Sequence, residues 1–274
     1  MTHLDAAEKS DRDATAHFEK AKELPWQKSF TEAGVGDWQE RWHLDGKKAT
    51  VETVDDGIEF AAGPKPGENA HMAVLWTRKS FRGDVKIGYR YTRTDNAEHS
   101  VNILYILATG KGAGPYHKDI MKWAKMRTVP TMSKYFKHMN LLHISYAAFP
   151  SPAMLARGAE RREYVRARRY PIPVGGGFKD IELESDYFQI GLFKPGVPHE
   201  ITVIKRGPYL MMKVEPEGGE AQHFFWDATG WPPLAEGRIG LRHMAGRSAR
   251  YENFTVETLA ENALPSIMQR NGGE

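Results

Sequence analysis

The chain has 274 residues, a net charge of +3 and 11% aromatic residues, and it contains no cysteine. This length fits one large β domain with short appendages. The absence of cysteine excludes disulfides and thiolate metal sites, and no apolar run reaches the roughly 18 residues that a membrane span needs. The polar N-terminus shows no signal-peptide core. We expect a periplasmic or cytoplasmic protein with no membrane partner, although a removed signal peptide would leave the same sequence.

The first part of the chain predicts a helical arm followed by strands. Residues 1–25 are expected to form a polar N-terminal arm with a short helix from Ala14 to Leu24, which Pro25 ends. From Trp26, runs that alternate apolar and polar residues predict strands, because successive side chains in a strand point to opposite faces. These runs span 38–44, 49–54, 57–62, 71–76, 84–93 and 100–109.

Residues 110–178 interrupt this pattern and are interpreted as an insertion. They predict helices near 116–126 and 131–139, one strand near 141–148, and then an arginine-rich segment. Its arginines are Arg157, Arg161, Arg162, Arg166, Arg168 and Arg169. Such a cluster favours an anionic partner, and a solvated surface is the plainer alternative.

The last third of the chain returns to the strand pattern. Alternating runs at 201–205, 209–214, 237–242 and 251–256 are separated by turns rich in glycine and proline. A side-chain period of two with regular turns indicates an antiparallel sandwich. We therefore predict an all-β fold with one domain at 26–259, followed by a polar tail at 260–274.

Several pieces of these strands resemble a known class of sandwich. The quoted pieces are His71-Met-Ala-Val-Leu-Trp76, Phe81-Arg-Gly-Asp84, Phe193-Lys-Pro-Gly196, His199-Glu-Ile-Thr-Val203, Gly237-Arg-Ile-Gly-Leu-Arg242 and Tyr251-Glu-Asn-Phe254. They resemble the concanavalin A-like lectin/glucanase superfamily, and within it the bacterial YesU-like family. The resemblance covers 26–259. It implies a jelly-roll of two antiparallel sheets and a role in carbohydrate processing, but it supplies no catalytic residues.

The leading hypothesis is a polysaccharide lyase that acts on an acidic, uronate-containing polysaccharide or oligosaccharide by β-elimination. Jelly-roll lyases neutralise the uronate carboxylate and remove a proton with Tyr or His, and fixed donors then stabilise the developing enolate. His143 and Tyr146 are the candidate acid and base, although a regular strand would point them to opposite faces. The candidate substrate-binding residues are His71, Arg90, Asn102, Tyr164, Arg168 and Arg242.

Two other functions remain open from the sequence. Glu182, Glu184 and Asp186 would share one face of an extended strand, and paired carboxylates are what glycoside hydrolases use. Three acids on an exposed strand are also simply solvated, and their spacing departs from the Glu-x-Asp pattern of the glycosidase branch. The other alternative is a non-catalytic, lectin-like carbohydrate-binding module.

The remaining ligand classes have little support in the sequence. The 11 histidines are scattered without metal-ligand spacing, so no metal site and no required cofactor are predicted, and a structural calcium ion is left open. The near-neutral charge and the lack of a nucleic-acid motif argue against nucleic acid as a partner. The sequence carries no signal for the oligomeric state.

Overall fold

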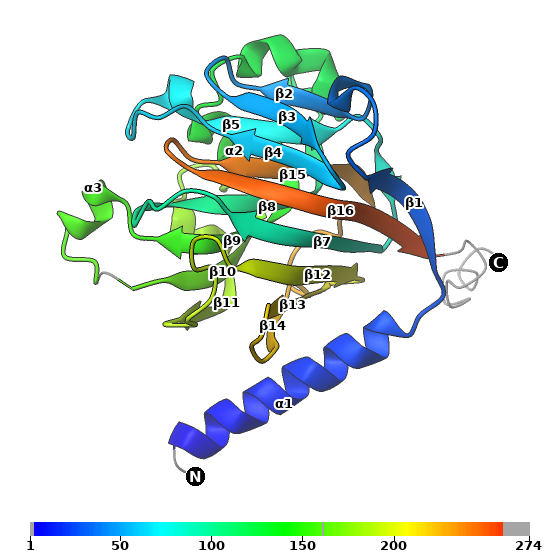
Figure 1. Ribbon diagram of the computed structural model, residues 1–274, viewed down its shortest axis with the longest axis vertical. Helices are drawn as coiled ribbons and strands as arrows, with labels where there is room; N and C mark the ends of the chain where they lie inside the picture. The colour runs from blue at the N-terminus through cyan, green and yellow to red at the C-terminus, as the bar shows by residue number, and fades with distance from the viewer. Residues whose placement is uncertain (1–2, 161, 260–274) are drawn as a thin grey trace.

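The computed structural model describes residues 3–160 and 162–259. Within them, two antiparallel sheets of eight strands each pack face to face as a β-sandwich (Figure 1). Strands with one apolar face form this architecture because each sheet must bury that face against another layer. The all-β sandwich predicted from the alternating runs is confirmed.

The first sheet, sheet A, supplies one side of the sandwich. Its strands are β1 (Trp26–Glu32), β3 (Thr50–Val54), β4 (Gly57–Ala61), β7 (Val85–Arg93), β12 (Pro198–Arg206), β13 (Tyr209–Pro216), β14 (Gln222–Asp227) and β16 (Ser248–Leu259). Their order is β14-β13-β12-β7-β16-β4-β3, and β1 pairs with β16. The predicted turn between β3 and β4 has Asp56 at a φ of 63°, in the left-handed region that tight hairpins use.

The second sheet, sheet B, supplies the other side. Its strands are β2 (Trp42–Asp45), β5 (Ala73–Thr77), β6 (Phe81–Arg82), β8 (Ser100–Gly110), β9 (Met139–Phe149), β10 (Tyr164–Tyr170), β11 (Glu182–Phe188) and β15 (Glu236–His243). Their order is β11-β10-β9-β8-β15-β5-β2, and β6 pairs with β15. Strand β10 lies in the arginine-rich segment that the sequence predicts as part of an insertion. The segment forms a strand because Arg166 and Arg168 alternate with the inward-facing Val165 and Ala167.

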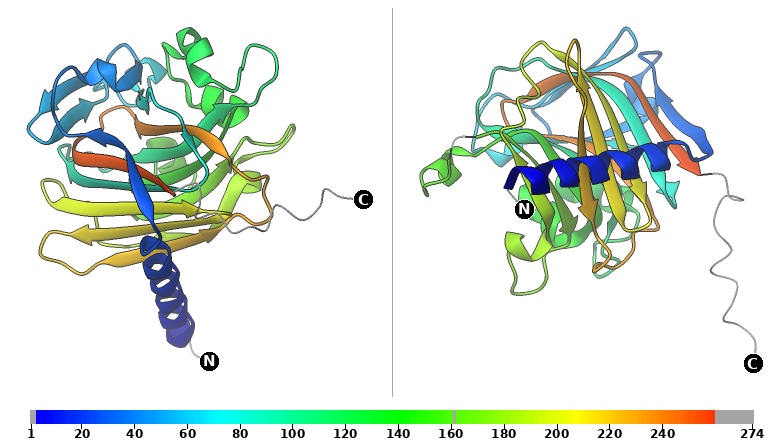
Figure 2. Two further views of the ribbon diagram at one scale, coloured as in Figure 1. Left: turned by 90° about the vertical axis from the view of Figure 1, so that its right-hand side faces the viewer. Right: turned by 90° about the horizontal axis from the view of Figure 1, so that it is seen from below.

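Helix α1 (His3–Lys22) lies across the outer face of sheet A, over β12, β13 and β14 (Figures 1 and 2). Phe18 and Ala21 of the helix are buried against Ile204 and Met211 of the sheet. The helix begins further upstream than predicted and ends at Lys22 instead of Leu24. This contact docks the second half of the helix against the sheet. The predicted tail at 260–274 lies outside the described residues.

The segment between β8 and β9 covers the outer face of sheet B. It contains the 3-10 helix η3 (Ile120–Arg127) and helix α2 (Met132–His138), close to the two predicted helices. Tyr135 of α2 stacks on Trp76 and Tyr105 of the sheet, with ring centroids 6.3 and 5.9 Å apart. Sheet B therefore buries both of its faces in this region. The remaining short helices are η1 (Trp38–Glu40), η2 (Asn69–His71), α3 (Pro152–Leu155) and η4 (Phe178–Ile181).

The carboxylate of Asp45 fastens this cover to the sheet. It is buried and accepts hydrogen bonds from Trp76 Nε1 at 2.7 Å, Arg127 Nε at 2.6 Å and the Tyr135 hydroxyl at 3.0 Å. These donors belong to β5, η3 and α2, and Asp45 itself to β2. One side chain thus joins two strands and two helices. None of the helices in the described part of the chain is long and apolar enough to cross a membrane.

We expect Asp45→Ala to lower the free energy of unfolding by about 3–5 kcal/mol, because it leaves the Arg127 guanidinium buried without its counterion. Urea denaturation followed by tryptophan fluorescence measures this change. Asp55→Ala, at an exposed position between β3 and β4, is the matched control and should stay within about 0.5 kcal/mol of the unmodified chain. Equal effects of the two substitutions would contradict the assigned role of Asp45.

Candidate functional site

Several of the sequence-predicted residues meet on the outer face of sheet B. His143 of β9 lies opposite Tyr105 of β8 and Arg168 of β10, and Arg168 lies opposite Glu182 of β11. Directly opposed residues share a face, with Cβ atoms about 5 Å apart. Arg242 of β15 lies on the same face, two residues from Gly240, which pairs with Tyr105. The structure therefore brings His143, Arg168 and Arg242 to one surface.

His143 is closed off within this surface. Its Nδ1 lies 2.8 Å from the Tyr170 hydroxyl, and its Nε2 lies 2.7 Å from Ser145 Oγ. The side chain is buried, and burial, together with the charge of Arg168 and two other arginines, lowers the pKa of His143 well below its usual value. Both ring nitrogens are engaged, so the neutral ring has no free position at which to take a proton from a substrate.

Two of the three candidate carboxylates are counterions of the neighbouring arginines. Arg166 Nε donates to Asp186 Oδ2 at 2.8 Å, and Arg168 Nη2 lies 3.3 Å from Glu182 Oε1. Glu184 is exposed. The register of β10 and β11 explains the second of these ion pairs, because Arg168 and Glu182 are directly opposed. These acids neutralise the sheet surface, and they do not form the free carboxylate pair that a glycosidase needs.

Tyr146 lies on the other side of β9 from His143, so the two candidate side chains do not share one surface. The Tyr146 hydroxyl is 3.1 Å from that of Tyr251 in the core between the sheets. Burial raises the pKa of Tyr146 well above its usual value. Asn102 also faces this core, where its Nδ2 donates to the Tyr91 hydroxyl at 2.7 Å. The side-chain amide of Asn102 therefore takes part in a buried hydrogen bond and does not line a cleft.

Two further candidates lie apart from this surface. Arg90 is on sheet A, where its guanidinium pairs with Glu200 at 3.0 Å and Glu217 at 2.6 Å. His71 ends η2, and its Nε2 lies 3.5 Å from Glu68 Oε2. Arg90 and His143 belong to different sheets, and the sandwich core separates them. Arg90 therefore cannot act on a ligand bound beside His143.

The last two candidates lie on sheet B but are covered. Tyr164, at the start of β10, has the guanidinium carbon of Arg166 4.5 Å from its ring centroid. Arg242 is fully buried, with its guanidinium carbon 4.6 Å from the centroid of the Tyr135 ring and its Nη2 donating to the Pro130 carbonyl at 2.8 Å. The guanidinium groups of Arg166 and Arg242 thus lie against the protein's own aromatic rings. The sequence could not show this because the covering residues lie far away along the chain.

A cavity that the sequence did not indicate opens at the loop end of the sandwich. Its volume is about 520 Å³, and we call it the loop-edge pocket. It lies between the β7–β8 loop, the end of β9, the approach to β10 and the segment before β12. Its lining residues are Arg93, Asn96, Glu98, Phe149, Arg162, Glu163, Gln189, Leu192, Phe193, Lys194 and Pro195. Amides, carboxylates and cations around an apolar floor are groups that orient a small polar ligand.

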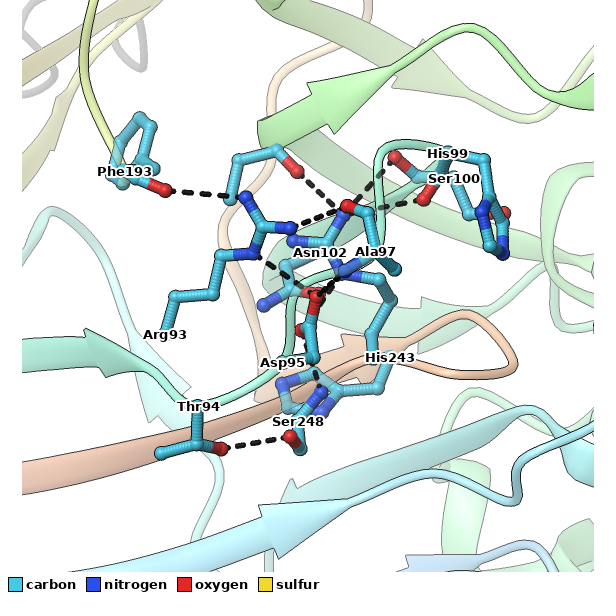
Figure 3. Close-up of polar contacts among 12 residues, drawn as sticks. Arg93, Thr94, Asp95, Ala97, His99, Ser100, Asn102, Phe193, His243 and Ser248 are labelled. Carbon is cyan, nitrogen blue, oxygen red and sulfur yellow. Dashed lines mark hydrogen bonds and ion pairs between the residues drawn. The ribbon is translucent and has the colours of Figure 1, made fainter. Parts of the chain in front are cut away.

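An ion-pair network fixes the walls of this pocket (Figure 3). Asp95 Oδ1 accepts from Arg93 Nε at 3.0 Å, and Asp95 Oδ2 accepts from Arg247 Nε, also at 3.0 Å. Arg93 Nη1 reaches the Phe193 carbonyl at 3.4 Å. Burial acts to raise the pKa of Asp95, but the guanidinium groups of Arg247 and Arg93 hold it below its usual value. Arg93 thus joins two walls of the pocket.

The backbone at the pocket carries a further sign of constraint. Gln189 and Phe193 have φ values of 55° and 59°, which side-chain-bearing residues seldom adopt. The Gln189 backbone N–H donates to the Glu163 carbonyl at 3.0 Å, which holds the segment against the approach to β10. Strained residues cluster at binding sites, where the surrounding structure maintains them. Among the described residues, no group of three or more His, Cys, Asp or Glu side chains is arranged to hold a metal ion.

The fold is shared with known carbohydrate-binding proteins, but no family model and no curated protein matches the chain. A Bacillus subtilis protein of unknown function with a galectin-like fold is 17% identical, covers 86% of this chain and 100% of its own, and gives a TM-score of 0.59. The exoplasmic/lumenal domain of VIP36, in a form bound to Ca²⁺ and Man3GlcNAc, is 10% identical, with coverages of 86% and 90% and a TM-score of 0.55. A Lotus tetragonolobus seed lectin is 10% identical, with coverages of 85% and 99% and a TM-score of 0.55.

These likenesses show a lectin-like, concanavalin A-like sandwich. They do not identify a particular family, so the resemblance to the YesU-like family stays a prediction.

The buried histidines predict a pH-dependent stability. Burial lowers the pKa of His243 to about 3 and that of His143 well below its usual value. In the unfolded chain both rings take up a proton near pH 6.5, so below this pH the unfolded state binds more protons. Their contribution is present above about pH 6.5 and is lost as the pH falls towards the folded pKa. Urea unfolding should show a loss of about 2 kcal/mol from His243 between pH 7 and pH 5, and a further loss from His143. His143→Gln should remove one of these losses, and an unchanged slope would contradict this account.

Proposed function

We propose that the protein is a non-catalytic, lectin-like carbohydrate-binding protein whose sugar occupies the loop-edge pocket. One observation carries the proposal: polar side chains converge on an open cavity, while His143 and Tyr146 are buried and hydrogen bonded. The fold supports it, because the VIP36 domain is bound to Man3GlcNAc and the related lectin UEA-II is complexed with galactose.

The pocket has the size and chemistry for a sugar ring. Its volume of about 520 Å³ falls within the usual range of small-molecule sites. Sugar hydroxyls both donate and accept, and the amides of Asn96 and Gln189 do the same. Phe149 and Leu192 offer apolar surface to the C–H face of a ring. These groups satisfy a saccharide's polar edge and its apolar face together.

The lining charges bear on the kind of saccharide. Glu98 and Glu163 are offset by Arg162 and Lys194, and the pocket therefore has no dominant sign. Arg162 lies near the surface, with its guanidinium carbon 4.2 Å from the centroid of the Phe188 ring. A carboxylated sugar would place its charge towards Arg162 and Lys194. An acidic saccharide remains our proposed partner, bound at this edge and not over the arginines of sheet B.

Catalysis is absent from this proposal because the acid–base groups are engaged. His143 has both nitrogens hydrogen bonded, and Tyr146 lies in the core. A general base must reach the proton that it removes. Incubation with uronate polymers should therefore yield neither the ultraviolet absorbance of an unsaturated product nor new reducing ends. Either signal, if it disappeared in His143→Gln, would contradict the non-catalytic proposal.

A saccharide panel measured by calorimetry tests the pocket directly. We expect Asn96→Ala to weaken binding of the preferred saccharide about five- to tenfold, the usual effect of losing one or two neutral hydrogen bonds. Asn69→Ala, at an exposed position in η2, is the matched control.

Arg168→Gln separates the two candidate surfaces. It should leave the affinity unchanged if the sugar occupies the loop-edge pocket. Loss of binding in Arg168→Gln with normal binding in Asn96→Ala would move the ligand to the outer face of sheet B. The absence of binding across the whole panel would overturn the proposed function.

A further inference from the structure

A second cavity enters the sandwich between the two sheets at the opposite side of β9 from His143. Its volume is about 280 Å³, and we call it the inter-sheet pocket. Most of its lining is apolar and includes Leu142, Pro208, Trp231 and Leu234. The β12–β13 turn and the β14–β15 loop form its rim. It shares no lining residue with the loop-edge pocket, so it is a separate site.

The inter-sheet pocket contains a buried arginine from sheet B. Arg169 lies opposite Leu142 in the register of β10 and β9 and therefore faces inward. It is 2% exposed and donates to the carbonyls of Tyr170 and Pro232, the latter at 2.9 Å. Within the described part of the chain, no acidic side chain forms an ion pair with Arg169. A guanidinium has more N–H donors than these two carbonyls use, so hydrogen-bonding capacity remains.

The charge balance of the pocket favours an anion. Lys205 of sheet A also lines it, with its Nζ 3.0 Å from Asp84 Oδ1. Of these two buried cations, only Lys205 is paired with an acidic side chain among the described residues. Burial lowers the pKa of Arg169 to about 10, with no neighbouring carboxylate to offset it. A buried cation without a counterion is costly. Arg127 and Arg93 elsewhere in the fold each have a carboxylate, and Arg242 lies against the Tyr135 ring. Arg169 instead borders an open cavity.

We propose that the inter-sheet pocket binds a small organic carboxylate, held by the Arg169 guanidinium with its ring or apolar body against Trp231. The guanidinium fork matches the planar geometry of a carboxylate. The Trp231 indole and the prolines of the rim offer a flat apolar surface to the rest of the molecule. This site lies beyond the proposed sugar-binding function and does not depend on it. A sugar acid and an apolar ring acid share this chemistry.

Paired probes test the site in the full chain. Ligand-observed NMR and calorimetry would compare glucuronate with glucose, and cyclohexanecarboxylate with cyclohexylmethanol. We expect at least one acid to bind, and its neutral partner to bind at least about tenfold more weakly. The acid that binds more tightly identifies the source as a sugar acid or an apolar acid.

Two variants localise the binding. Arg169→Lys keeps a positive charge but loses the fork, and we expect it to weaken the acid at least about tenfold. Trp231→Leu, at a half-buried position, should weaken binding of the same acid. Because this variant keeps Arg169, it still tests the site if Arg169→Lys does not fold. Asn69→Ala, the exposed position in η2, is the control and should bind the acid normally.

Three results would overturn the assignment. These are the absence of measurable affinity for either acid at millimolar concentration, neutral partners that bind as tightly as the acids, and pocket variants that both bind like the unmodified chain. Loss of acid binding in Asn96→Ala alone would place the acid in the loop-edge pocket and would equally contradict the inter-sheet site.

Discussion

The buried carboxylate of Asp45 is the interaction on which the arrangement of this molecule depends. By binding Trp76, Arg127 and Tyr135, it holds η3 and α2 against the outer face of sheet B. That face becomes a second core instead of an open platform. The cover buries Arg242 and belongs to the same apolar cluster as Tyr105 and Tyr170. The two cavities proposed as binding sites therefore lie at the edges of the sandwich and not on the outer face of sheet B.

A second carboxylate has the corresponding role at the loop edge. Asp95 bridges Arg93 and Arg247, and Arg93 also reaches the Phe193 carbonyl across the pocket wall. The same chemistry, a carboxylate that accepts hydrogen bonds from several elements, closes one surface and shapes another. Where a buried cation has no such acid, as at Arg169 beside the inter-sheet pocket, the missing counterion becomes the basis for inferring a ligand.

The strands were largely predictable because one face of each is apolar. In β7, Val85, Ile87 and Tyr91 point into the core with the expected period of two. Strand β10 is harder to predict because its arginines resemble a solvated charge cluster, although Arg166 and Arg168 alternate with the buried Val165 and Ala167. The opposite orientations of His143 and Tyr146 followed from the same period. The burial of His143 could not be predicted from this period, because it depends on contacts between segments that are distant along the chain. The loop-edge pocket was equally hidden, since its lining comes from several separate loops.

A structure of the complex with the preferred saccharide tests the central claim most directly. The account predicts a sugar ring in the loop-edge pocket beside Asn96 and Gln189, with α2 still docked through Asp45 and the His143 ring still bonded to Ser145 and Tyr170. A sugar bound on the outer face of sheet B, in contact with His143 and Arg168 after displacement of α2, would contradict it.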